Sequence, residues 1–175
     1  YGVKLYHDSL TCAFNRRYYE DVVQGFEGSF GVAIMDLDDF KIYNDSCGHQ
    51  AGDLALEVTA AVIRDCIRQT DTLIRYGGDE FLLILPGCPI EKIRSKLEQI
   101  RARVQTTSVP GYPHIHLSLS IGGVLQTAED TMETAVHCAS RLMYQAKEHK
   151  NTVIVASSSA VLSAPATLLP KQSRQ

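Results

Sequence analysis

The sequence predicts an α+β domain, a mixed α/β sandwich in which helices surround a central sheet. Helical and strand-like segments follow one another in the order α-β-α-α-β-β-α-β-α-β. Two strand-like segments, residues 72–76 and 81–85, flank Gly77 and Gly78, and glycine supplies the positive φ that a tight turn needs. A sheet that contains such a hairpin and is covered by helices fits the layered α+β architectures.

The first half of the chain alternates strongly apolar and helix-patterned segments. We expect a helix at 15–24, a strand at 31–37, a short helix at 38–44 and a long helix at 51–67. Asp38 is the expected N-cap of the short helix, because a carboxylate there can accept hydrogen bonds from free backbone amides. In the long helix, Leu54, Val58 and Val62 repeat at helical spacing and indicate its buried face.

The second half adds the hairpin and further helices and strands. We expect a helix at 90–104, a strand at 115–121, a helix at 131–149 and a short strand at 153–155. The strand at 115–121 is inferred from strict alternation of apolar and polar residues, which is typical of a half-buried strand. From residue 157 onward the chain is rich in Ser, Ala and Pro, so we expect disorder there.

The composition is that of one globular domain. The 175 residues are 45% hydrophobic and carry a net charge of -3, which argues against a nucleic-acid-binding protein. The five cysteines are odd in number and form no C-x-x-C pair, which favours reduced thiols in a cytoplasmic protein. No apolar run is long enough to span a bilayer. The chain begins with Tyr rather than Met, so we expect it to be part of a longer protein, whose other segments could anchor it to a membrane.

Acidic residues gather at two places where chemistry is expected. Asp36, Asp38 and Asp39 follow the apolar strand at 31–37, and Asp79 and Glu80 lie at the hairpin tip. Carboxylates at the ends of rigid elements suit Mg²⁺, which usually brings substrate phosphates with it. Two such ions, roughly 3.5–4 Å apart, could clamp the attacking and leaving oxygens of a displacement at phosphorus. The alternative is that these are solvated turn residues, which is common for aspartate.

Several motifs, in the same order along the chain, resemble the GGDEF family of diguanylate cyclase domains. The hairpin segment at 75–81 reads Arg-Tyr-Gly-Gly-Asp-Glu-Phe and resembles the family signature. Asp8-Ser9-Leu10-Thr11 with Asn15-Arg16-Arg17 is similar to the opening motif of the family. The stretch from Asp36 to Lys41, with Asn44-Asp45, Gly48-His49 and Gly52-Asp53, resembles its nucleotide-binding segment. Ser120-Ile121-Gly122 and Tyr144-Gln145-Ala146-Lys147 match its later landmarks, so the resemblance covers residues 8–155.

The resemblance implies a fold, an activity and partners. The fold would be a palm-like central sheet with a catalytic β-hairpin, similar to nucleotide cyclase and polymerase palm domains. The domain would span residues 8–156, after the end of a connecting helix at 1–7 and before a tail at 157–175. It would condense two GTP molecules into cyclic di-GMP and two pyrophosphates in a homodimer, each subunit holding one GTP. An N-terminal sensor or receiver domain in the parent protein would control it, and neither nucleic acid nor membrane contact is implied.

The resemblance also implies a metal centre of two Mg²⁺ or Mn²⁺ ions per active site. Asp36, the backbone carbonyl of Leu37, Asp79 and Glu80 would be its ligands. Asp79 would also be the base for the 3′-hydroxyl of GTP, and Asp36, Glu80 and Lys41 complete the implied catalytic set. The physical logic agrees, because a carboxylate beside a cation stays ionised and ready to accept a proton.

The triphosphate of GTP would be held at a helix start by backbone amides and cations. The amides of Asp39 and Phe40 would point at phosphate oxygens, and Lys41 and Lys147 would neutralise charge on the triphosphate. After Lys147 the usual Gly-Arg-Asn of the family is shortened, so Lys150 would replace an arginine that holds phosphate. Lysine cannot make the bidentate contact of arginine, which predicts a modest loss of affinity or rate.

The guanine base would be read by Asn44 and Asp53. Asp53 can accept hydrogen bonds from the N1–H and the amino group of guanine, and adenine offers no such donor pair. His49 either lies near the nucleotide or has a capping or packing role.

Arg68 and Asp71 form an R-x-x-D motif shortly before Gly77, where the family binds its inhibitory product. Arginine can bind phosphate or a guanine edge bidentately, and aspartate can accept from guanine. The alternative is a helix-terminal arginine near the negative end of the helix dipole.

Three functions remain open from the sequence. An active cyclase is favoured by the intact acidic signature. A catalytically silent receptor for GTP or cyclic di-GMP is the main alternative. An unrelated metal-dependent nucleotidyl transferase with a palm architecture is disfavoured by the pair Asn44 and Asp53.

Overall fold

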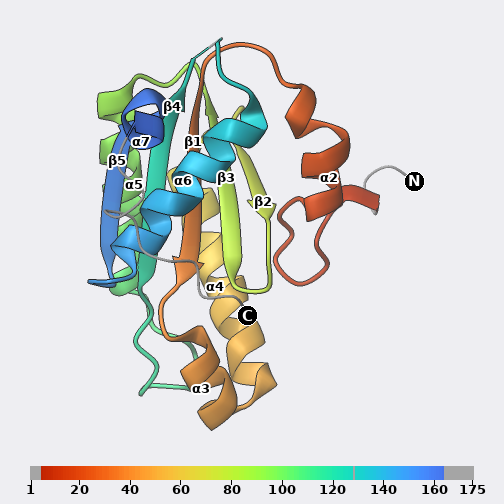
Figure 1. Ribbon diagram of the computed structural model, residues 1–175. Helices are drawn as coiled ribbons and strands as arrows, with labels where there is room; N and C mark the ends of the chain where they lie inside the picture. The colour runs from red at the N-terminus through yellow and green to blue at the C-terminus, as the bar shows by residue number, and fades with distance from the viewer. Residues whose placement is uncertain (1–4, 128, 164–175) are drawn as a thin grey trace.

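The chain is described by a computed structural model that covers residues 5–127 and 129–163 (Figure 1). Its centre is a five-stranded sheet in the order β2-β3-β1-β4-β5. The strands are β1 (Phe30–Leu37), β2 (Thr72–Arg75), β3 (Glu80–Pro86), β4 (Leu119–Gln126) and β5 (Thr152–Ser157). Neighbouring strands are antiparallel except β4 and β5, which run parallel. The predicted α+β class, with a mixed sheet and a hairpin, is confirmed.

Helices cover both faces of the sheet (Figure 1). The helices α4 (His49–Cys66) and α5 (Ile90–Gln105) lie on one face, and α6 (Met132–Ala146) crosses the other. The 3₁₀ turn η1 (Val23–Gly25) and α7 (Ser158–Ser163) contact α6, and α2 (Arg16–Asp21) lies beside β2. The helix α3 (Phe40–Cys47) lies beyond one end of the sheet. Among the described residues, no helix combines the length and the apolar character needed to cross a membrane.

The central strand β1 is buried along its whole length because helices pack on both of its faces. Val32 and Ile34 belong to the core beneath α6, and Ala33 and Met35 belong to the core beneath α4 and α5. A strand fixed from both sides is a rigid support, so the residues at its carboxyl end, beginning with Asp36, are held in defined positions.

Two predictions at element ends were wrong. The short helix begins at Phe40 and is N-capped by Asp39 in a left-handed conformation (φ 60°), not by Asp38, whose carboxylate is buried and bonded elsewhere. The strand predicted at 115–121 begins only at Leu119. Ile115 and Leu117 are buried although they lie outside any strand, and His116 between them forms only an isolated bridge with Ser108, so alternating burial alone does not define a strand.

The prediction of disorder from residue 157 was wrong for the first part of the tail. Ser157 ends β5, and Ser158–Ser163 forms α7 with Ser158 and Val161 buried. The composition of the tail could not predict this helix, because the helix depends on a tertiary contact. Val161 packs in the core cluster that also contains α6 residues. Residues 164–175 of the predicted tail and residues 1–4 of the predicted connecting helix lie outside the described residues.

Candidate active site

The two acidic segments singled out in the sequence meet at one end of the sheet. In the antiparallel pairing of β1 with β3, Asp36 lies opposite Glu80. The backbone amide of Leu37 donates a hydrogen bond to the carbonyl oxygen of Asp79 at 3.1 Å. The tip of the hairpin is therefore docked against the carboxyl end of β1, which brings Asp36, Asp79 and Glu80 together.

Asp36 has the most strongly perturbed environment of these acids. It is 8% exposed, and its Oδ1 atom has no hydrogen-bond partner, although Lys147 Nζ lies 3.4 Å away. Burial and then the negative charge of Asp79 raise the pKa of Asp36 to about 8, against the opposing charge of Lys147. Burial and Asp79 also raise the pKa of Glu80. The fold thus holds these carboxylates together in a place where a cation would stabilise their charged forms.

The chemistry of this cluster fits a hard divalent cation. The Asp36 carboxylate, whose Oδ1 accepts no hydrogen bond, lies next to Asp79, and the two provide the oxygen ligands that Mg²⁺ prefers. Across residues 5–127 and 129–163, no three acidic, histidine or cysteine side chains form a ready metal-binding group. An ion between Asp36 and Asp79 would therefore complete its shell from backbone oxygens such as that of Leu37, from substrate phosphate and from water.

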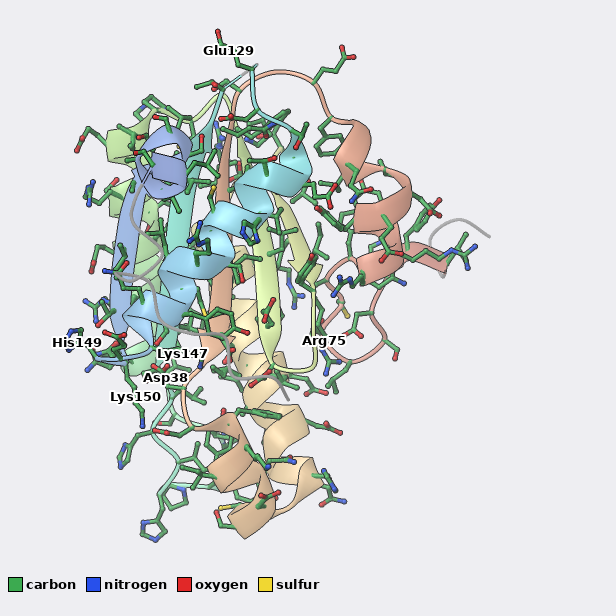
Figure 2. The ribbon with its side chains drawn as sticks, in the orientation of Figure 1. Asp38, Arg75, Glu129, Lys147, His149 and Lys150 are labelled. Carbon is green, nitrogen blue, oxygen red and sulfur yellow. The ribbon has the colours of Figure 1, made fainter. Side chains whose placement is uncertain are left out.

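Asp38 is an anchor rather than a helix cap. Its carboxylate accepts hydrogen bonds from the hydroxyls of Ser118 and Ser120, both at 2.6 Å, and from the amide of Asn151 at 2.8 Å. Lys147 Nζ lies 3.9 Å from Oδ1 of Asp38. Figure 2 shows Asp38, Lys147 and Lys150 together at the end of the sheet. Asp38 thereby ties the end of β1 to β4 and to the turn that follows α6.

Cations and free amides lie beside this anchor. The first amides of α3 have no intrahelical acceptor, and the side chain of Asp39 does not cap them. Lys150 Nζ donates instead to the carboxylate of Asp39 at 2.6 Å. Lys41 lies exposed in the first turn of α3. The predicted phosphate-binding groups, from Asp39 and Phe40 to Lys147 and Lys150, thus gather around one helix start.

The predicted guanine-reading residues lie where α3 meets α4. The side-chain amide of Asn44 is 3.2 Å from Nδ1 of His49. A methyl group at Gly52 would overlap Oδ1 of Asn44 and approach the ring of Phe40 to 3.2 Å. Asp53 is the next residue and is exposed. Asn44 can therefore occupy its present position only because Gly52 has no side chain.

Arg68 and Asp71 are paired with each other at a cavity. The guanidinium of Arg68 donates to the Asp71 carboxylate at 2.9 Å and to the carbonyl oxygen of Pro86 at 3.0 Å. A cavity of about 290 Å³ is lined by this pair and by Lys92, Ser95 and other residues. α4 ends at Cys66, so Arg68 lies beyond its last turn, and its side chain bonds to Asp71 before β2 and to Pro86 at the end of β3.

Sequence reasoning missed two arginines that hold the hairpin. Arg75 donates to the carbonyl oxygen of Gly78 at 2.8 Å, and Arg16 donates to that of Tyr76 at 3.3 Å. The guanidinium of Arg16 also lies 4.1 Å from the centroid of the Tyr76 ring. Its positive charge partly offsets the rise in the pKa of Glu80. Both arginines stand in motifs that were recognised, but their partners become visible only in three dimensions.

The chain is similar to proteins of one family in both sequence and fold. Residues 5–152 match the family described as diguanylate cyclase, GGDEF domain. Diguanylate cyclase DgcM of Escherichia coli (strain K12) is 30% identical over 159 residues, which are 86% of this chain and 38% of DgcM. Diguanylate cyclase DosC of the same organism is 33% identical over 149 residues, which are 80% of this chain and 32% of DosC. The chain thus spans less than half the length of these curated relatives.

Solved structures show the same architecture. The GGDEF domain of DgcB from Caulobacter crescentus, in complex with c-di-GMP, is similar with a TM-score of 0.79 and 26% identity, over 86% of this chain and 95% of that one. The GGDEF domain of PA1120 from Pseudomonas aeruginosa has a TM-score of 0.78 and 30% identity, over 90% of this chain and 99% of that one. The fold that the motifs implied is therefore confirmed.

Proposed function

The chain belongs to the GGDEF family of diguanylate cyclase domains, and on this premise we propose that it is an active cyclase that makes cyclic di-GMP from two GTP. The observation that carries the proposal is the docking of the hairpin tip on β1, which collects Asp36 and Asp79 beside Lys147. The buried Asp36 carboxylate next to the partly exposed Asp79 suits a divalent cation that carries a triphosphate.

Each condensation forms a bond between the 3′-oxygen of one GTP and the α-phosphorus of the other. The bond from that phosphorus to the β-phosphate oxygen breaks, and pyrophosphate leaves. Asp79 accepts the proton of the 3′-hydroxyl. Lys147, beside Asp36, and Lys41 on α3 offset charge that builds on the phosphates. Two Mg²⁺ or Mn²⁺ ions, when bound by Asp36, Leu37, Asp79 and Glu80, would stabilise the attacking and leaving oxygens.

The nucleotide lies along α3 in this proposal. Free amides at Asp39 and Phe40 bind phosphate oxygens, and Lys150 moves from Asp39 to the phosphates. At the other end of α3, Asn44 and Asp53 read the guanine, in the space that Gly52 leaves open. An acceptor at Asp53 left without donors would reject ATP.

Two copies of the domain must face each other, because each holds one GTP and the reaction needs two. A segment of the parent protein outside this chain, such as an N-terminal sensor or receiver domain, would bring the copies together. The greater length of DgcM and DosC supports a longer parent. Activity of the chain alone should then rise more steeply than its concentration.

The Arg68 cavity supports a second role, which is binding of cyclic di-GMP as an inhibitor. Arg68 can exchange its contacts with Asp71 and Pro86 for a phosphate or a guanine edge, and Lys92 adds positive charge to the cavity. If the chain is instead a silent receptor, this binding would be its whole function. Calorimetry with cyclic di-GMP should show binding that Arg68→Ala removes, and GTP turnover separates the inhibited enzyme from the receptor.

The direct test is to identify what the domain makes from GTP and Mg²⁺ by chromatography. Cyclic di-GMP with pyrophosphate supports the cyclase. Unchanged GTP at high protein concentration, even with a dimerising segment fused before Tyr1, would favour the receptor. A cyclic mononucleotide would contradict the proposal and indicate that this fold carries a different nucleotide cyclase activity.

A further inference from the structure

The pair Arg68 and Asp71 also lines a second cavity, which the proposed function does not use. This second cavity has a volume of about 250 Å³ and is bounded by Gln69 and residues 12–14 as well as by the pair itself. The first cavity, of about 290 Å³ beside Lys92, is lined by the same pair. The two cavities therefore adjoin at Arg68 and Asp71.

Neither cavity alone has the size of a complete site for a cyclic dinucleotide. Pockets that bury a drug-sized ligand usually measure about 300–1,000 Å³, whereas the two cavities measure about 290 and 250 Å³. Cyclic di-GMP needs a site from the upper part of the usual range, because it holds two guanine bases, two riboses and two phosphates. One guanine with its phosphate therefore fits each cavity better than the whole molecule does.

Each cavity adds positive charge to that of the shared Arg68. Lys92 supplies it in the first cavity, and Arg64 supplies it in the second. Arg64 has no acidic partner among the described residues, since the carboxylate of the neighbouring Asp65 pairs with Arg103. A guanidinium without a carboxylate partner is suited to bind a phosphate bidentately.

We propose that cyclic di-GMP binds across both cavities, with one guanine and its phosphate in each, and that Arg64 binds the phosphate in the second cavity. This inference deepens the inhibitory role proposed for the Arg68 cavity and rests on it. The apolar side chains of Ile67 and Leu73 line the second cavity and can pack on a base, and the amide of Gln69 can bond to its edge. Apolar walls with a few polar groups are typical of small-molecule sites.

A ligand in the second cavity would also act on the hairpin tip. Arg64 donates to the carbonyl oxygen of Thr11, and the amide and hydroxyl of Thr11 donate to the carboxylate of Asp8. Asp8 in turn pairs with Arg75, whose guanidinium donates to the carbonyl oxygen of Gly78. A phosphate that draws Arg64 away from Thr11 would loosen this chain of contacts, so bound product could slow the reaction through it.

Three free cysteines of the chain report where cyclic di-GMP binds. Cys88 lines the first cavity, and the exposed Cys12 lines the second. Cys47 is exposed at the end of α3 and reports on the proposed catalytic site. The reaction of each thiol with N-ethylmaleimide is followed by mass spectrometry. At a concentration about tenfold above its Kd, cyclic di-GMP should slow Cys12 and Cys88 about tenfold, because only the free protein reacts, and should leave Cys47 unchanged.

The role of Arg64 is tested by calorimetry with cyclic di-GMP. Arg64→Gln should bind the dinucleotide about tenfold more weakly than the original chain, because a charge-assisted hydrogen bond to phosphate is lost. Arg94→Gln is the matched control, since Arg94 is exposed on α5 and lines neither cavity. It should bind within about twofold of the original chain, because an isolated surface charge contributes little.

The outcomes separate this inference from the proposals on which it rests. Slowing of Cys88 without Cys12, or equal affinity of Arg64→Gln and the original chain, would overturn the inference and leave the inhibitory role of Arg68 intact. If cyclic di-GMP slows neither thiol, that role and the inference fail together. If it slows both in a chain that makes no cyclic di-GMP from GTP, the inference holds and the proposed cyclase activity fails.

Discussion

The guanidinium of Arg75 contacts both carboxylate oxygens of Asp8, each at 3.3 Å. The same guanidinium donates to the carbonyl oxygen of Gly78, and the Asp8 carboxylate also accepts from the amide and the hydroxyl of Thr11. Figure 2 shows Arg75 beside the hairpin. The loop at the start of the domain is thus joined through one arginine to the tip that carries Asp79.

Asp8→Asn should remove a stabilising contribution that depends on pH. Burial alone would raise the pKa of Asp8, but the hydrogen bonds from Thr11 and the charge of Arg75 outweigh it and lower this pKa below 3.8. A lowered acid pKa stabilises the fold above the ordinary pKa, and the contribution is lost as pH falls through the folded value. Urea unfolding should show Asp8→Asn destabilised by about 2 kcal/mol at pH 7.

The difference between Asp8→Asn and the original chain should stay constant from neutral pH down to about pH 5 and shrink below the ordinary aspartate pKa. Asp45→Asn, at an exposed position, is the matched control and should change little. A difference that is the same at pH 3 and pH 7 would disprove the ionic part of this account.

Asp36→Asn should stabilise the metal-free domain while abolishing turnover. The pKa of Asp36 is raised to about 8, so between the ordinary value and pH 8 the folded protein binds more protons than the unfolded chain. Stability therefore falls as pH rises through this range. In thermal unfolding, the advantage of Asp36→Asn should grow by about 1.4 kcal/mol for each pH unit between pH 5 and pH 8. Mg²⁺ with a GTP analogue whose α,β-bridge is a methylene group should raise the unfolding temperature of the original chain only, and an advantage that is independent of pH would argue against this electrostatic origin.

The sequence was sufficient to predict the helices and strands that have a strong hydrophobic pattern and clear end signals. The apolar run of β1 and the stripe of α5 have this character, and both lie where they were expected. Asp38 shows why other details could not be predicted. Its place between the apolar strand and the short helix predicted a helix cap. Its hydrogen-bond partners Ser118, Ser120 and Asn151 are distant in the chain, so the sequence around Asp38 does not reveal them.

Gly52→Ala should weaken GTP binding although alanine is the better helix former. The new methyl group would overlap Oδ1 of Asn44 and displace the side chain proposed to read guanine. KM for GTP should rise about tenfold, because small displacements of binding groups have large effects. Gly25→Ala, where nothing lies within 4 Å of the added methyl group, is the control for kinetics. An unchanged KM in Gly52→Ala would exclude Asn44 from the guanine site.

Asp38→Asn should loosen the end of the sheet. Asparagine keeps one acceptor oxygen for the three donors that now bond to Asp38, so at least one buried group loses its partner. We expect a loss of about 2–3 kcal/mol in urea unfolding and a lower kcat, since Lys147 lies beside this carboxylate. Ser118→Ala removes one of these bonds and should cost less than Asp38→Asn. Equal stability of Asp38→Asn and the original chain would show that the anchor is not needed.

Residue types at the site were easier to predict than their connections. The acidic signature, Asn44 and Asp53 could be proposed as site residues from motifs, whereas the contacts of Arg16 and Arg75 with the hairpin are apparent only in the fold. Tyr43 shows the same limit, because the sequence does not reveal that its hydroxyl is buried without a hydrogen-bond partner among the described residues.

The measurement that tests the central claim most directly follows GTP, cyclic di-GMP and pyrophosphate over time in the presence of Mg²⁺. It compares the original chain, Asp79→Asn and the exposed control Asp65→Asn in the last turn of α4, each with a dimerising segment fused before Tyr1. The account predicts two pyrophosphates for each cyclic di-GMP from the original chain and from Asp65→Asn, and at least a hundredfold less from Asp79→Asn, as expected for loss of a general base. Equal product from Asp79→Asn, or none from the original chain, would contradict it.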